Sequence, residues 1–215
     1  MASKTKGQLV HIQVGSVVLD GELVIPPQAK GVVIFAHGSG SSRHSPRNKF
    51  VAEELQKVGI GTLLFDLLTE KEDEIYETRF NIDLLTDRLI AATKWLKRQK
   101  QFTDLKIGYF GASTGAAAAL AAAADLGSDI SAVVSRGGRP DMALAILDKV
   151  TAPTLLIVGG EDEIVIELNE KAFAQLKSEK QLEIVPGATH LFEEPGALER
   201  VALLAADWFK KYLFS

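Results

Sequence analysis

GYFGASTGA, residues 108–116, is the stretch of sequence that decides the fold. It places Gly-x-Ser-x-Gly around Ser113, between an apolar run at residues 105–110 and an alanine-rich segment at residues 114–124. In a strand–turn–helix unit this spacing makes a turn so sharp that the serine takes a strained backbone conformation and stands clear of the sheet. Side chains at the two glycine positions would collide with the neighbouring strand and helix. The stretch therefore predicts a strand, a nucleophile elbow and a helix.

Strand-like and helix-like segments alternate from residue 31 to the end of the chain. Strands are predicted at residues 32–36, 62–66, 105–110, 132–135, 154–158 and 181–185, and helices near 48–58, 82–97, 114–124, 142–147 and 168–176 and after Pro195. This order predicts an α/β fold with an open, mostly parallel sheet and helices on both faces. Residues 8–25 alternate strictly between apolar and polar around Gly15, which predicts an antiparallel N-terminal hairpin. We expect about eight strands in a single domain over residues 1–215, and a solvated loop over the acidic residues 67–79.

Composition excludes several classes of function. The chain has 215 residues, of which 47% are hydrophobic and 24% are charged, and its net charge of −4 gives no basic surface for nucleic acid. No apolar run is long enough to cross a bilayer, and no apolar segment follows the positive charges of residues 1–6, as a secretory signal requires. The chain has no cysteine, which excludes thiol chemistry, and no His/Asp/Glu cluster has metal-ligand spacing. We therefore expect a cytoplasmic protein with no cofactor or metal and no membrane or nucleic-acid partner; the oligomeric state is not indicated.

Three polar side chains that follow predicted strands have complementary chemistry. In an open α/β sheet, ligands bind beyond the carboxyl ends of the strands, where Ser113, Asp162 and His190 are all expected. A serine hydroxyl needs a base to become a nucleophile, and His190 can take its proton and later return it to the leaving group. An aspartate on the other ring nitrogen fixes the tautomer and stabilises the imidazolium. The three positions therefore predict a catalytic Ser–His–Asp site.

Alternatives exist for the acid and for the base. Glu161 and Asp141 are the other candidates for the acid, and His44 is an outside candidate for the base. His37 directly precedes a glycine, so its ring is expected to brace the loop. Asp66, at the end of another strand, is expected to be structural, and His11 is expected at the surface.

An anionic tetrahedral intermediate needs backbone donors. The nitrogen of Thr114 is available at a helix N-terminus, directly after the nucleophile. The second donor is expected from the loop after the first buried strand, with Ser39 as the choice and Gly40 as its neighbour. A plain turn is the alternative for this loop. A dinucleotide fingerprint is disfavoured, because the third glycine would fall at Arg43.

Two arginines near the predicted site leave two alternatives open. Arg136 directly follows a strand, and Arg43 belongs to the loop that offers the oxyanion donor, so both are expected to face the acyl pocket and favour an ester with a free carboxylate. The alternative is that one or both pair with acids such as Asp66 or Asp141 and hold loops in place.

The chain resembles the dienelactone-hydrolase branch of the α/β-hydrolases over about residues 31–212. The motifs are HGSG at residues 37–40, GASTG at 111–115, GGED at 159–162 and GATHLF at 187–192. The chain order Ser113, Asp162, His190 is that of the α/β-hydrolase triad. The resemblance is closest to small hydrolases that are sometimes fused to a phosphoribosyltransferase domain. We expect no such second domain within these 215 residues.

The resemblance implies an α/β-hydrolase fold and a serine hydrolase that cleaves a small carboxylic ester or thioester through an acyl-enzyme. Dienelactone hydrolases use a cysteine where Ser113 stands, so dienelactone itself is not the expected substrate. The short segment between Arg136 and the strand at residue 154 leaves no room for a cap domain. Two other classes of function stay open: a binding protein or receptor on a hydrolase fold, and an amidase or peptidase.

Overall fold

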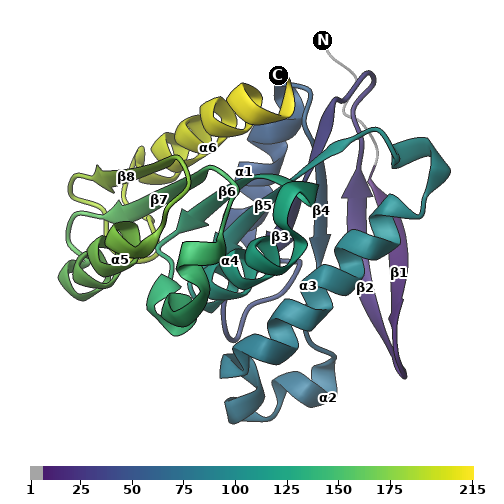
Figure 1. Ribbon diagram of the computed structural model, residues 1–215, viewed down its shortest axis with the longest axis horizontal. Helices are drawn as coiled ribbons and strands as arrows, with labels where there is room; N and C mark the ends of the chain where they lie inside the picture. The colour runs from purple at the N-terminus through teal and green to yellow at the C-terminus, as the bar shows by residue number, and fades with distance from the viewer. Residues whose placement is uncertain (1–6) are drawn as a thin grey trace.

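One eight-stranded sheet, in the order β1-β2-β4-β3-β5-β6-β7-β8, runs through the whole protein (Figure 1). The computed structural model describes residues 7–215; residues 1–6, which bear on the expectation about a secretory signal, lie outside the described part. The strands are β1 (Gln8–Val14), β2 (Val17–Val24), β3 (Gly31–Ala36), β4 (Gly61–Phe65), β5 (Lys106–Ala112), β6 (Ile130–Arg136), β7 (Thr154–Gly159) and β8 (Lys180–Val185).

Strand direction and burial follow the sequence pattern. β1 pairs antiparallel with β2, and β2 pairs antiparallel with β4, whereas all pairs from β4 to β8 are parallel. In β1 the alternating residues Val10 and Ile12 are buried, while every residue of β3 is buried. The half-solvated hairpin and the fully covered central strands therefore confirm the predicted mostly parallel sheet with an antiparallel N-terminal hairpin.

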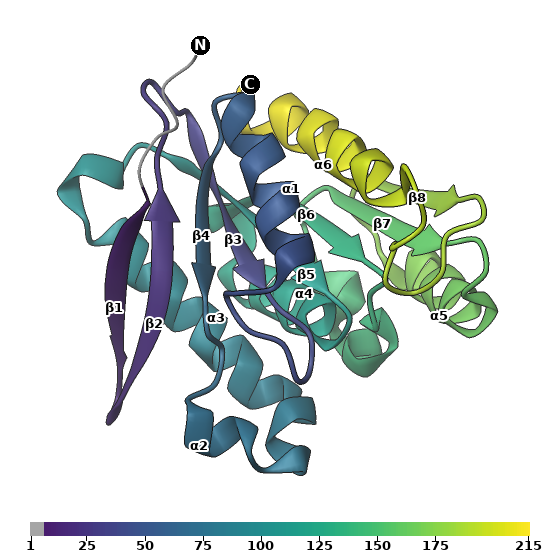
Figure 2. The same cartoon turned by 180° about the vertical axis from the view of Figure 1, so that it is seen from behind.

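Helices cover both faces of the sheet, as expected. They are α1 (Pro46–Lys57), α2 (Glu70–Asp73), α3 (Ile82–Lys97), α4 (Thr114–Leu126), α5 (Glu163–Gln175) and α6 (Ala197–Leu213). Helices α3, α4 and α5 lie on the face turned to the viewer in Figure 1, and α1 and α6 lie on the opposite face, seen in Figure 2. Two hydrophobic cores thus sandwich the central strands, and the strand ends remain free to carry a site.

The turn between β5 and α4 is packed as closely as the glycine spacing predicts. A Cβ on Gly111 would lie 2.4 Å from the Cα of Ala116, and one on Gly115 would lie 2.2 Å from the carbonyl oxygen of Ala36. The alanines of α4 let the helix approach the sheet, and Ala116 to Ala119 are fully buried. Larger side chains at these positions would push the helix away from β3 and β5.

The expected loop over residues 67–79 is partly helical, which corrects the sequence prediction. Thr69 and Glu72 form a capping box at the start of α2, and a 3₁₀ turn follows at Tyr76–Phe80. Glu72 also pairs with the buried Arg88 of α3 at 2.7 Å, which ties this acidic segment to the core. The signal, a threonine followed three residues later by a glutamate, was present in the sequence.

Other differences are small and lie at element ends. Helix α5 begins at Glu163, five residues before the predicted start at residue 168, and the short helix expected at 142–147 is a 3₁₀ segment, Pro140–Lys149. Over residues 7–215 the chain forms no separate cap domain, which confirms that prediction. None of the helices in the same range combines the length and apolar character needed to cross a membrane.

Candidate active site

Ser113 is on the strained elbow that its sequence predicts. Its backbone has φ 51° and ψ −123°, a region that L-residues rarely adopt. Three backbone hydrogen bonds hold it there: its N–H donates to the carbonyl of Arg136 at 3.3 Å, and its carbonyl accepts from Ala116 and Arg139, both at 3.0 Å. The neighbouring strand β6 therefore fixes the position of the serine.

His190 and Asp162 come from separate loops and meet directly. Nδ1 of His190 donates to Oδ2 of Asp162 at 2.6 Å, and the aspartate side chain is only 16% exposed. The loops after β7 and β8 lie against each other, because the N–H of Glu161 donates to the carbonyl of Ala188 at 3.0 Å. A Cβ on Gly159 would lie 2.4 Å from that same carbonyl oxygen, so glycine is required for this approach. The hydrogen bond leaves Nε2 of His190 as the ring nitrogen available to a nucleophile.

The alternative acids and bases have other surroundings. Asp141 accepts two hydrogen bonds from the guanidinium of Arg139, both at 2.8 Å. His11 pairs with Asp20 at the surface, as expected. His44 lines a cavity that is not the one containing Ser113. Among the named alternatives, the structure joins only Asp162 to His190.

Ser113 and His190 line one small cavity of about 220 Å³, together with Ser39 and Arg136. The loop after β3 forms the wall beside the nucleophile: a Cβ on Gly38 would lie 3.0 Å from the Cβ of Ser113. The base, the nucleophile and the loop expected to carry a donor are thus brought together.

The positions expected for the oxyanion donors lie beside the nucleophile. Thr114 is the first residue of α4, so its N–H has no acceptor within the helix and lies at the positive end of the helix dipole. Ser39 lines the cavity with Ser113. Gly40 has φ 65°, and Arg79 approaches the outer side of that turn, with a guanidinium nitrogen 3.5 Å from a Cβ placed there.

His37 braces this loop, as expected. Nδ1 donates to the carbonyl of Gly38 at 3.0 Å, and Nε2 accepts from the N–H of Leu67, also at 3.0 Å. These two contacts require the neutral ring with the proton on Nδ1. Burial lowers the pKa of His37 below its usual value and keeps the ring neutral.

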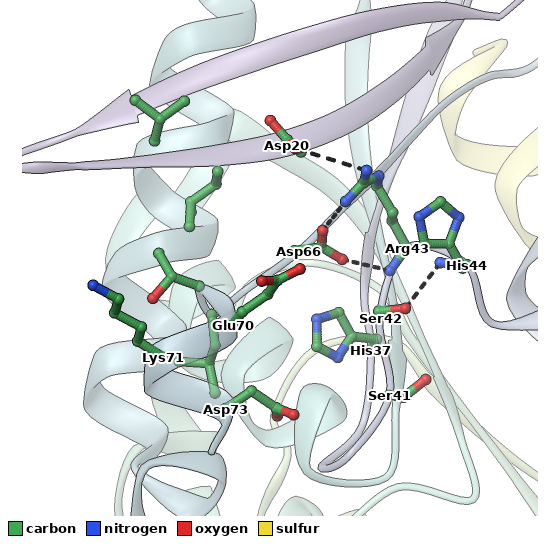
Figure 3. A pocket seen from close by; sticks show the side chains of 14 residues that line it. Asp20, His37, Ser41, Ser42, Arg43, His44, Asp66, Glu70, Lys71 and Asp73 are labelled. Carbon is green, nitrogen blue, oxygen red and sulfur yellow. Dashed lines mark hydrogen bonds and ion pairs between the residues drawn. The ribbon is translucent and has the colours of Figure 1, made fainter. Parts of the chain in front are cut away.

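Arg43 does not line the cavity of Ser113, so the expectation that it faces the acyl pocket is wrong, and the alternative, a pair with Asp66, is confirmed. Its backbone N–H donates to Asp66 at 2.8 Å, its guanidinium contacts the other oxygen of that carboxylate, and Asp20 lies 3.7 Å away (Figure 3). This network lines a second cavity of about 550 Å³, separate from that of Ser113. Two carboxylates within reach of the loop draw the arginine to this side, and Asp66 has the structural role expected of it.

Arg136 does lie in the cavity with Ser113. The residue is 7% exposed, its guanidinium donates to the amide oxygen of Asn48 at 3.4 Å, and it lies 5.9 Å from the centre of the Phe192 ring. Burial, and to a lesser extent repulsion from Arg47, lower the pKa of Arg136 to about 10, so the side chain remains a cation at neutral pH. Asp141, a partner considered for it, is bound to Arg139 instead.

Two residues at the site were missed from the sequence. Arg47 lines the same cavity and pairs with Glu193 at 2.8 Å. Gly137 has φ 50°, and a Cβ there would lie 3.1 Å from the carbonyl oxygen of His190 and 3.5 Å from its ring carbon Cε1. The pair of glycines directly after β6 was the available signal for such a close approach.

Comparison with known proteins agrees with this architecture. The dienelactone hydrolase family matches residues 19–213. A putative phosphoribosyl transferase of Mycobacterium tuberculosis is 57% identical over 204 residues, which cover 95% of this chain and 46% of that protein. The chain therefore spans about half the length of the curated relatives it matches.

Solved structures share the whole fold. The dienelactone hydrolase from Anabaena variabilis has a TM-score of 0.95 and 56% identity, covering 98% of this chain and 99% of that one. An α/β serine hydrolase without lid from Xanthomonas campestris has a TM-score of 0.76 at 21% identity, covering 97% of this chain and 96% of that one. The second likeness concerns the fold alone. The chain belongs to the dienelactone hydrolase family of α/β-hydrolases.

Proposed function

We propose that this protein is a serine hydrolase that cleaves small carboxylic esters or thioesters through an acyl-enzyme. Ser113 is the nucleophile, His190 the general base and acid, and Asp162 the residue that orients the histidine. The observation that carries the proposal is the 2.6 Å hydrogen bond from His190 to Asp162, in loops that bring His190 into the cavity of the strained Ser113. These are the groups that acyl transfer needs.

The reaction follows from the proton positions. His190 holds its Nδ1 proton against Asp162, so Nε2 takes the proton of the Ser113 hydroxyl as the oxygen attacks the ester carbonyl. The N–H groups of Thr114 and Ser39 are the proposed donors to the anionic oxygen of the tetrahedral intermediate. The carbon–oxygen bond to the alcohol then breaks, and His190 gives its proton to that alcohol. Water repeats the sequence on the acyl-enzyme and releases the acid.

The relatives that are 57% identical are named putative phosphoribosyl transferases, and they are about twice as long as this chain. This chain matches 46% of the Mycobacterium tuberculosis relative, and this chain itself shares the fold of the dienelactone hydrolase from Anabaena variabilis. We assign the hydrolase chemistry to the part that this chain covers. Phosphoribosyl transfer is not proposed for the site of Ser113.

A serine-reactive probe tests the proposal. A fluorophosphonate should label the purified protein at Ser113, and the label should be lost in Ser113→Ala but kept in Ser42→Ala, which changes a serine of the other cavity. A panel of an ester, a thioester and an amide of one acid should show faster turnover of the first two. Absence of labelling would favour a binding protein on a hydrolase fold, and preferred cleavage of the amide would favour an amidase.

A further inference from the structure

A groove of about 320 Å³ lies between the first turns of α1 and the start of α6, two helices on the face of the sheet seen in Figure 2. Its apolar lining consists of Phe50, Phe192, Pro195 and Leu198. Phe192 is buried, but Phe50 and Leu198 are only partly covered by the rest of the protein. We call this hollow the α1–α6 groove. An apolar ligand would remove the uncovered parts of these side chains from water.

The α1–α6 groove borders the cavity of Ser113. Arg47 lines both of them. Phe192 lines the groove, and the guanidinium of Arg136, in the cavity, lies 5.9 Å from the centre of the same ring. His190 lines the cavity and stands only two residues before Phe192 in the chain. A molecule that extends from the serine past the histidine therefore reaches the groove.

The loop at residues 189–194 holds the wall between the cavity and the groove in place. The N–H and the hydroxyl of Thr189 donate to the carboxylate of Glu194 at 3.1 and 2.5 Å, and the N–H of Phe192 donates to the carbonyl of Thr189 at 3.2 Å. Phe192 has φ 57°, a conformation that a bulky side chain adopts only at an energetic cost. Strain of this kind persists where the surrounding contacts fix the position of a side chain, so the groove has a defined wall.

Charge limits which apolar ligand the groove accepts. Glu193, Glu194 and Glu199 line it, and Arg47 is the only cation among the described residues that do so. Glu193 pairs with that arginine at 2.8 Å, and the other two glutamates leave an excess of negative charge. Like charges repel across a binding surface, so an anionic ligand is disfavoured there. The ligand that fits is therefore apolar and uncharged.

The position of the base decides which part of an ester points toward the groove. His190 gives its proton to the leaving alcohol, so the oxygen of that alcohol lies within hydrogen-bond distance of Nε2. The cavity of Ser113, at about 220 Å³, is smaller than the roughly 300–1,000 Å³ of most small-molecule sites. It has room for a short acyl group and the reacting carbonyl, whereas a large alcohol needs the space beyond the histidine.

We propose that the α1–α6 groove binds the alcohol part of the ester and favours an uncharged aromatic alcohol of about the size of a benzyl group. This proposal rests on the ester hydrolysis proposed above and adds the class of its leaving group. The ring would pack against Phe50 and Leu198, where aromatic and aliphatic contacts replace water. The chemical step is the same: the bond between the carbonyl carbon and the alcohol oxygen breaks, and the alcohol takes its proton from His190.

Matched esters test which side of the ester carries the ring. Wild-type protein should hydrolyse benzyl acetate with a kcat/KM at least about tenfold above that for methyl acetate, because only the larger alcohol reaches the groove. Methyl phenylacetate, an isomer of benzyl acetate with the ring on the acyl side, should show no such gain. Equal efficiency on benzyl acetate and methyl acetate, or a greater gain for methyl phenylacetate, would overturn the proposal.

A charged analogue tests the glutamates of the groove. The anionic ester 4-carboxybenzyl acetate should be hydrolysed at least about threefold less efficiently than benzyl acetate, because its carboxylate meets like charges. Equal or better hydrolysis of the anionic ester would overturn the choice of an uncharged alcohol.

Substitutions in the groove locate the effect. Phe50→Ala and Leu198→Ala should each lower the ratio of kcat/KM for benzyl acetate to kcat/KM for methyl acetate by at least about threefold, because each removes part of the apolar surface. This ratio does not depend on the fraction of protein that is folded, so a destabilised variant still gives a result. Leu203→Ala changes an exposed leucine of α6 outside the groove and is the matched control, which should keep the wild-type ratio. A preference that survives both groove variants would overturn the proposal.

A binding measurement separates the groove from the proposed chemistry. Saturation-transfer NMR should show the ring protons of benzyl acetate in contact with Ser113→Ala, and the double variant with Phe50→Ala should bind this ester at least about threefold more weakly. If the fluorophosphonate does not label Ser113 but the ring still binds in this way, the hydrolase is overturned and the groove stands as a site for aromatic ligands. If methyl acetate is cleaved but the double variant binds benzyl acetate as well as Ser113→Ala does, the groove is overturned and the hydrolase stands.

Discussion

Arg43 and Arg136 follow different strands toward the same edge of the sheet, yet their surroundings differ. Arg43 is bound by Asp66 and lies near Asp20, whereas within residues 7–215 the guanidinium of Arg136 contacts an amide oxygen and an aromatic ring but no carboxylate. Their two cavities share the lining residue Ser41, so they lie on two sides of one loop. The difference shows that an arginine paired with a carboxylate serves to hold loops and strands in place. A guanidinium without such a partner is available to a ligand.

The strongest test of the comparison removes the nucleophile from one cavity. Ser113→Ala should lower ester turnover by about a million-fold, because the serine acts as a unit with its base. Ser42→Ala, in the other cavity, should leave kcat within about threefold, as for a surface substitution outside the site. Steady-state kinetics with one activated ester measures both. Comparable losses in the two variants would mean that the cavities are not functionally distinct.

The acid that orients the base should give the next largest effect. Asp162→Asn should lower kcat by about 10⁴-fold, because the histidine would then favour the wrong tautomer. Asp141→Asn is the matched control, since Asp141 is bound by Arg139 and not by His190. A damaging Asp141→Asn with a silent Asp162→Asn would reverse the assignment of the acid.

Arg43 should matter for stability and little for ester turnover. Arg43→Gln leaves Asp66 half-buried without its cation, and we expect a loss of about 1–2 kcal/mol in the free energy of unfolding, discounted for the partial exposure of both side chains. Urea denaturation measures this loss. Turnover of an activated ester should stay within about twofold of wild type. A large loss of turnover would place Arg43 in the site of Ser113 after all.

The smallest expected effect is the pH dependence contributed by His37 on the wall between the cavities. Its pKa is lowered in the folded protein, so the unfolded chain binds a proton first as the pH falls. Stability should therefore be complete above pH 6.5 and should decrease below it, by up to about 1.4 kcal/mol per pH unit for this one group.

A comparison of variants isolates this contribution. His37→Gln should show a shallower loss of unfolding free energy between pH 6.5 and 5.5 than wild type. Identical slopes for wild type and His37→Gln would show that the buried ring does not couple folding to protonation.

The parts of the fold that depend on local pattern could be predicted from the sequence. The alternation in residues 8–25 indicated the hairpin, and the glycines around Ser113 indicated the elbow, because both patterns act through neighbours in the chain. The carboxyl-end rule placed Ser113 and His190 at one edge, where the structure puts them in one cavity.

The rest depends on which side chains find each other across loops. A pair between an arginine and Asp66 was one of the alternatives that the sequence left open, but the sequence could not decide between that pair and the acyl cavity for Arg43. It also did not indicate that Asp20 lies close to Arg43. Arg47 was missed because α1 begins at Pro46, two residues before the predicted start, and a helical turn directs that side chain into the cavity. Helix ends and side-chain partners are set by tertiary contacts that a single sequence does not display.

The hydrogen bond between the backbones of Ser113 and Arg136 has an evolutionary consequence. The carbonyl that holds the elbow belongs to every amino acid, so its support does not depend on which side chain stands at position 136. A single substitution at position 136 can therefore change the charge of the cavity wall from basic to neutral or acidic while the nucleophile keeps its position. Substrate preference can thus change at that position without any change in the backbone that holds Ser113.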